Sequence, residues 1–142
     1  DCLRIHDGTG FPVILDVFHH ALNNRGEPLR RAVGAAAGTW GAADGIPMVD
    51  YSSQEPGKRS GTHAATLDPG HFRRFLGATR PHDLDIMLEI KDKERSALLA
   101  LDTATGDPRL TRRDSGKRTG EKGSSERLLN ARTGHRKGGK RP

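Results

Sequence analysis

Residues 11–24 read FPVILDVFHHALNN. The uninterrupted apolar residues from Pro12 to Leu15 predict a short strand buried on both faces, as in a parallel sheet covered by helices. Asp16 ends this strand, and His19 follows three residues later in what we expect to be a loop. A carboxylate and an imidazole at this spacing can bind one cation. The alternative is that Asp16 caps the next turn and that His19 is solvated.

Two later strands end in the same way. Residues 46–51 (IPMVDY) contain Asp50, and residues 84–90 (LDIMLEI) contain Glu89. Apolar residues at helical spacing, with capping residues before them, predict helices over residues 1–6, 27–37, 69–79 and 94–103. The expected order is therefore α-β-α-β-α-β-α, which is typical of an α/β protein with a parallel sheet.

These strand ends predict a metal site made of oxygen and nitrogen ligands. The carboxyl ends of parallel strands share one edge of a sheet, where chemistry is usually sited. Asp16 with His19, Asp50 and Glu89 would meet there, and His63 would reach the same edge from the long loop 52–67. Such ligands suit Mn²⁺, Mg²⁺, Fe²⁺ or Zn²⁺. Clustered divalent ions are the usual solution for cleaving a phosphodiester bond.

The charge of the chain is concentrated near one end. Residues 106–142 hold 12 Lys and Arg against 4 Asp and Glu, a net charge of +8, whereas residues 1–105 have a net charge of −2. We therefore expect one folded domain over residues 1–105 and a basic, low-complexity, disordered tail over residues 106–142. Such a tail either attracts nucleic acid phosphates or only keeps the protein soluble. The single cysteine and the lack of a long apolar run or secretory leader predict a cytoplasmic protein that does not enter membranes.

Three blocks of sequence carry a resemblance to a known family. They are LDVFHH at 15–20, MVDYSSQ at 48–54 with His63 downstream, and DIMLEIK at 85–91. In this order and spacing they resemble the UV DNA damage endonuclease (UVDE) family over roughly residues 1–101. The resemblance implies a TIM-barrel repair enzyme that cuts double-stranded DNA on the 5′ side of ultraviolet photoproducts with a cluster of divalent ions, typically Mn²⁺. It would act in the cytoplasm, associated with the nucleoid when bound to DNA.

The resemblance also implies roles for individual residues. Asp16, His19, His63 and Glu89 fall on metal-ligand positions of the family. Asp50 falls where characterised members have a histidine ligand, and Met48 falls where some carry a modified lysine. Lys91 is a candidate catalytic residue as a phosphate contact, with a simple surface lysine as the alternative.

The chain is short for a complete TIM barrel, which needs eight strands and about 250 residues. We therefore expect a partial (β/α)8 barrel made of the last three β/α units, with the amino-terminal barrel segment missing, and no activity of this chain alone. Two alternatives stay open. One is an inactive remnant or basic nucleic-acid-binding protein, and the other is a xylose-isomerase-like TIM-barrel metalloenzyme. The isomerase would need an aromatic substrate pocket, and the chain has only one Trp, one Tyr and four Phe.

Overall fold

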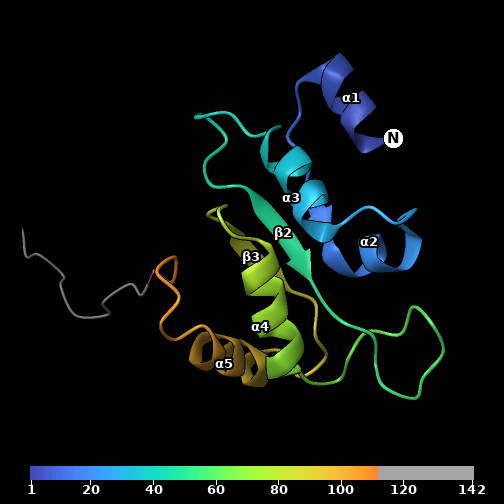
Figure 1. Ribbon diagram of the computed structural model, residues 1–142, viewed down its shortest axis with the longest axis vertical. Coiled ribbons are helices and arrows are strands. Elements are labelled where there is room, and N and C mark those ends of the chain that lie inside the picture. Colours follow the sequence, from blue (N-terminus) through green and yellow to red (C-terminus); the bar gives the residue numbers. More distant parts are fainter. Residues whose placement is uncertain (112–142) are drawn as a thin grey trace, which may run out of the picture. The chain divides into compact units, whose positions relative to one another are not determined.

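The computed structural model describes residues 1–111 and shows helices on one side of a small sheet (Figure 1). The basic segment predicted over residues 106–142 lies outside the described residues from residue 112 onward. The elements are α1 (Cys2–Thr9), β1 (Leu15–Asp16), α2 (Val17–Asn23), α3 (Leu29–Ala37), β2 (Met48–Tyr51), α4 (Pro69–Ala78), β3 (Asp85–Leu88) and α5 (Glu94–Thr103).

The three strands form one parallel sheet in the order β1-β2-β3. This confirms the predicted α/β class and strand direction, although every strand is shorter than predicted. The backbone of Val13 shows why β1 begins late. Its N–H donates to Thr39 Oγ1 (2.8 Å) and its carbonyl accepts from Trp40 Nε1 (2.9 Å). The side chains of Thr39 and Trp40, which follow α3, thus make the hydrogen bonds to Val13 that a neighbouring strand would otherwise have made.

The prediction of a loop around His19 is wrong, because residues Val17–Asn23 form helix α2. Asp16 caps this helix by accepting a hydrogen bond from the backbone N–H of His19 (2.8 Å). The buried Val17 and Phe18 in its first turn anchor it to the rest of the unit. The first helix extends past the predicted range of 1–6, because α1 continues through Gly8 to Thr9. Gly10 follows it in the left-handed conformation that is common after helices (φ 74°).

Helices cover one face of the sheet. Tyr51, fully buried on β2, packs against Phe72 and Phe75 of α4 with ring centroids 5.0 and 4.8 Å apart. The core continues through Val49 of the same strand to Ala100 of α5. The opposite face is open, since Met87 on β3 remains 46% exposed. The sheet therefore presents a second, uncovered face whose carboxyl edge carries the candidate site.

Structured contacts continue past residue 105. Leu110 packs against the core, and Arg109 hydrogen-bonds to the carbonyl oxygens of Leu76 and His82. The predicted domain boundary at 105/106 itself stays a prediction. None of the described helices is long and apolar enough to span a lipid bilayer.

Candidate metal centre

The end of β1 places Asp16 and His19 against each other. Besides capping α2, Asp16 accepts a hydrogen bond at Oδ2 from His19 Nδ1 (2.5 Å). A histidine whose Nδ1–H is held by a carboxylate keeps Nε2 free as a ligand atom, as in many carboxylate–histidine–metal arrangements. The pair can therefore serve a cation either through both side chains or through His19 oriented by Asp16.

The hydrogen bond between Asp16 and His19 shifts the pKa of both side chains. Burial raises the pKa of Asp16, but the hydrogen bonds from the backbone and ring of His19 outweigh it and hold that pKa below its usual value. In turn, the hydrogen bond and the negative charge of Asp16 raise the pKa of His19. Asp16 is thus an ionised oxygen donor at neutral pH.

The central strand supplies Asp50. It lies in register with Asp16 on β1 and with Met87 on β3. Its Oδ1 is buried and has no hydrogen-bond partner among the described residues. Burial and then the negative charges of Glu89 and Asp16 raise the pKa of Asp50. An unpartnered carboxylate oxygen beside two other carboxylates is unfavourable without a positive charge nearby, so the site suits a cation.

His63 and Glu89 complete the edge. The backbone N–H of Glu89 donates to Tyr51 O (2.9 Å), which continues the pairing of β3 with β2. His63 Nδ1 lies 3.2 Å from the backbone oxygen of Glu89 and 4.0 Å from its Oε2. The rings of His63 and His19 are 5.9 Å apart between centroids. Both predicted histidine ligands thus reach the same edge from different elements.

Phe18 is a residue of the candidate metal centre that the sequence analysis did not predict. It is buried beneath the two imidazoles, with ring centroids 4.8 Å from His63 and 5.7 Å from His19. Its position before His19 in the sequence was the available signal, because an apolar residue there becomes the anchor of α2. The aromatic ring thus packs against both candidate ligands.

The five predicted ligands share one edge, but they do not form a finished coordination shell. Within residues 1–111, no three His, Cys, Asp or Glu side chains come close enough together to hold a metal ion. Asp16 and His19 form a hydrogen bond with each other. Asp50 instead interacts with Glu89 and Asp16 through the repulsion between their negative charges. The chemistry of these oxygen and nitrogen donors suits a hard or borderline divalent cation.

The structure also places Lys91, the predicted phosphate contact, and His20, the neighbour of His19. The side chain of Lys91 is exposed beyond Glu89, and its backbone N–H donates to Ala64 O (3.4 Å). No ion pair involves Lys91 in the part of the chain that the structure describes. His20 has its Nε2 3.2 Å from the carbonyl oxygen of Glu27. Lys91 is therefore accessible to an anion, whereas the imidazole of His20 connects α2 to the segment before α3.

Comparison with known proteins finds one consistent family. A family model described as UV-endonuclease UvdE matches residues 1–110. A protein of Acanthamoeba polyphaga mimivirus whose name places it among UV-damage endonucleases is 34% identical over 101 residues, covering 69% of this chain and 30% of its own length. A UV DNA damage endonuclease of Clostridium perfringens is 30% identical over 105 residues, covering 72% of this chain and 26% of its own length.

A solved structure agrees with these relatives. The crystal structure of SacUVDE superposes with a TM-score of 0.71 at 45% sequence identity, covering 78% of this chain and 36% of SacUVDE. The chain spans about three tenths of the length of the two curated relatives. Because the family model matches well over half of it, the chain belongs to the UV-endonuclease UvdE family.

Proposed function

We propose that this chain is part of a DNA repair endonuclease that cuts DNA containing ultraviolet photoproducts with the help of divalent metal ions. One observation carries the proposal: three adjacent parallel strands bring Asp16, Asp50 and Glu89 to their carboxyl ends, where Asp50 is the second-last residue of β2 and Glu89 directly follows β3. The buried Asp50 Oδ1 lacks a partner among the described residues. The names of the relatives supply the substrate class, which is UV-damaged DNA. The same relatives favour this function over a sugar isomerase.

We further propose that the three strands are a segment of a TIM barrel. The open face of the sheet supports this, since Met87 is exposed on a strand whose other face packs on helices. A cavity of about 580 Å³ also runs along β3 and α5, lined by apolar residues that include Ile86, Leu88 and Leu101. A further β/α unit packed beside β3 would cover these side chains and pair the free edge of the strand.

In the completed barrel, bound divalent ions would supply the positive charge that the cleavage of a phosphodiester bond requires. We propose Mn²⁺ first, with Mg²⁺, Zn²⁺ or Fe²⁺ as alternatives. Asp16, Asp50 and Glu89 would hold the ions as oxygen ligands. His19, oriented by Asp16, and His63, supported by Phe18, would act as nitrogen ligands.

Lys91 would contact a phosphate of the DNA next to this edge, because its side chain is exposed just beyond Glu89. The ligands of the missing strands would come from the rest of the barrel. By itself the chain offers only part of the site, so we expect the isolated 142-residue chain to be inactive. The complete enzyme would work in the cytoplasm, associated with the nucleoid while it is bound to DNA.

A chimera tests this function. Residues 1–110 of this chain would replace the segment of SacUVDE to which they correspond, and the purified chimera would be assayed on UV-irradiated duplex DNA with Mn²⁺. We expect metal-dependent cutting that falls at least about 100-fold in Glu89→Gln and in Asp50→Asn. Asp102→Asn, which changes an exposed carboxylate on α5, is the matched control and should stay active. A folded chimera that does not cut, or one indifferent to all three changes, would overturn the proposal.

A further inference from the structure

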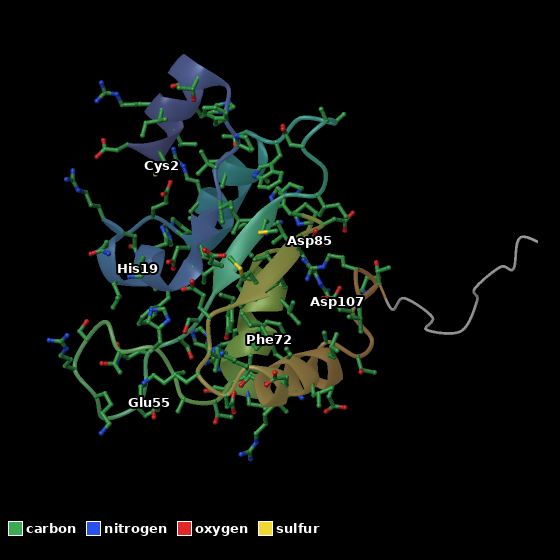
Figure 2. All side chains as sticks on the ribbon, turned by 180° about the vertical axis from the view of Figure 1, so that it is seen from behind. Cys2, His19, Glu55, Phe72, Asp85 and Asp107 are labelled. Atoms are coloured by element: carbon green, nitrogen blue, oxygen red, sulfur yellow. The ribbon has the colours of Figure 1, made fainter. Side chains whose placement is uncertain are left out.

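The loop between β2 and α4 has an unusually well-defined base. Gln54 and His63 pair as an antiparallel bridge, and the backbone N–H of Glu55 donates to Thr62 O (2.8 Å). The segment between them, residues 56–61, turns back on itself and is exposed along its whole length. Figure 2 shows Glu55, at the base of this loop, on the same side of the molecule as His19. Because the ring of His63, at the base of the loop, lies 5.9 Å from that of His19 between centroids, the base of the loop adjoins the candidate metal centre.

The side chain of Gln54 holds the interior of this loop. Its Nε2 donates to the carbonyl oxygens of Glu55 (3.0 Å) and Arg59 (3.0 Å) and lies 3.4 Å from that of Lys58. Its Oε1 accepts a hydrogen bond from the backbone N–H of Gly61 (2.9 Å). One amide thus satisfies backbone groups along most of the turn, which fixes the path of an otherwise exposed segment.

Two glycines make this path possible. Gly57 and Gly61 have φ values of 70° and 86°, in the left-handed region that residues with a Cβ rarely adopt. A Cβ added at either position would meet no atom within 4 Å beyond its own neighbours in the chain, so the requirement is conformational rather than steric. The sequence PGKRSG therefore encodes a specific turn, with Lys58 and Arg59 between its two glycines.

The two cations at the tip have no acidic partner in residues 1–111. No ion pair of the described residues includes Lys58 or Arg59. The nearest acidic residue in sequence, Glu55, is engaged elsewhere, because its Oε2 accepts the backbone N–H of Ala65 (2.5 Å). The loop thus presents two uncompensated positive charges from a fixed backbone, next to a sheet edge that is rich in carboxylates.

We propose that residues 56–61 form a preorganised clamp for the phosphate backbone of duplex DNA, with Lys58 and Arg59 as the phosphate contacts and Gln54 as the positioning residue. The inference rests on the proposed function, which brings DNA to this edge. A backbone held by Gln54 before binding loses less conformational entropy when the phosphates dock. The contacts read the position of the backbone and not the base sequence.

The test measures how DNA affinity depends on salt. The full 142-residue chain is titrated with an undamaged, fluorescently labelled duplex, without divalent ions, at several salt concentrations. Each phosphate contact contributes about 0.9 to the slope of log K against log salt concentration. Lys58→Ala/Arg59→Ala should therefore lower the slope by about 1.8. The basic residues 106–142 are present in every variant and cancel in the comparison.

Arg30→Ala/Arg73→Ala is the charge-matched control, since it removes two exposed arginines from α3 and α4. We expect its slope to stay within about 0.5 of the parent chain. Gln54→Met keeps both loop charges but removes the amide; it should weaken DNA binding several-fold and speed hydrogen exchange at the Gly61 amide. Equal slope changes in the loop and control variants, or an unchanged loop slope, would overturn the clamp. This binding assay contains neither metal nor damaged DNA. Its result therefore does not depend on whether the SacUVDE chimera cuts irradiated DNA.

Discussion

Replacing Arg109 by methionine would remove the side chain that connects the carboxyl-terminal end of the described unit to α4. The guanidinium donates to the carbonyl oxygens of Leu76 (2.8 Å) and His82 (3.0 Å) and forms a two-pronged ion pair with Asp107 (2.8 and 3.0 Å). It also lies 3.3 Å from Thr79 Oγ1. Only 16% of the Arg109 side chain and 9% of the Asp107 side chain are exposed, so water replaces these partners poorly.

The expected loss follows from these contacts. A hydrogen bond to a charged group contributes about 1.5–3 kcal/mol to stability, and a partner left buried and unpaired adds a further penalty. Partial exposure favours the lower end of this range, so we expect Arg109→Met to lower the free energy of unfolding by about 3 kcal/mol. With a urea dependence of about 1.5 kcal/mol/M, the unfolding midpoint would fall by about 2 M.

Urea unfolding followed by circular dichroism measures this change. Arg109→Lys keeps the charge but not the planar fork, and should lose about half as much stability. Arg30→Met on the exposed side of α3 is the control and should change stability by less than about 0.5 kcal/mol. If the unfolding midpoint of Arg109→Met is indistinguishable from that of the control, the contacts of Arg109 do not hold the end of the described unit against α4.

Three further predictions use the same unfolding assay. The hydrogen bond from Arg109 lowers the pKa of Asp107 from 3.8 to about 2. Its stabilisation of about 2 kcal/mol is therefore complete above about pH 5 and is lost progressively as the pH falls through about 2; Asp107→Asn should lack this acid-dependent loss. Tyr51→Phe removes the bond between Tyr51 Oη and His71 Nδ1 (2.7 Å) and should cost about 1 kcal/mol, whereas no loss would show that the bond is not needed. Ser96→Ala leaves the buried backbone N–H of Leu67, in the loop before α4, without its acceptor and should cost about 2 kcal/mol; a neutral result would contradict that role.

The parts of the fold that depend on local sequence patterns were predictable. Asp68 followed by Pro69 specified the start of α4, and the leucine-rich stretch from Glu94 to Thr103 matched α5 residue for residue. The strand directions also followed from the alternation of strands and helices. These features need only capping chemistry and hydrophobic periodicity, which neighbouring residues carry.

Features that depend on distant partners were not predictable. The strand expected from Pro12 was shortened because Val13 bonds to residues that follow α3. The roles of Gln54 and Arg109 were missed because most of the groups that these two side chains bind in other residues belong to the backbone, which leaves no trace in the residue types. Conversely, the position of the three carboxylates at one edge needed only strand order. The positions of His19 in α2 and His63 in the loop depend in addition on side-chain packing such as that of Phe18.

The measurement that tests the central claim most directly is the Mn²⁺ content of the SacUVDE chimera, determined by elemental analysis and electron paramagnetic resonance after removal of free metal. If the carboxyl edge binds divalent ions, the chimera will retain Mn²⁺, and Asp16→Asn and Glu89→Gln will each weaken retention at least about tenfold, whereas the control Asp102→Asn will not. Equal metal content in all four folded proteins would show that these strand ends do not bind the metal.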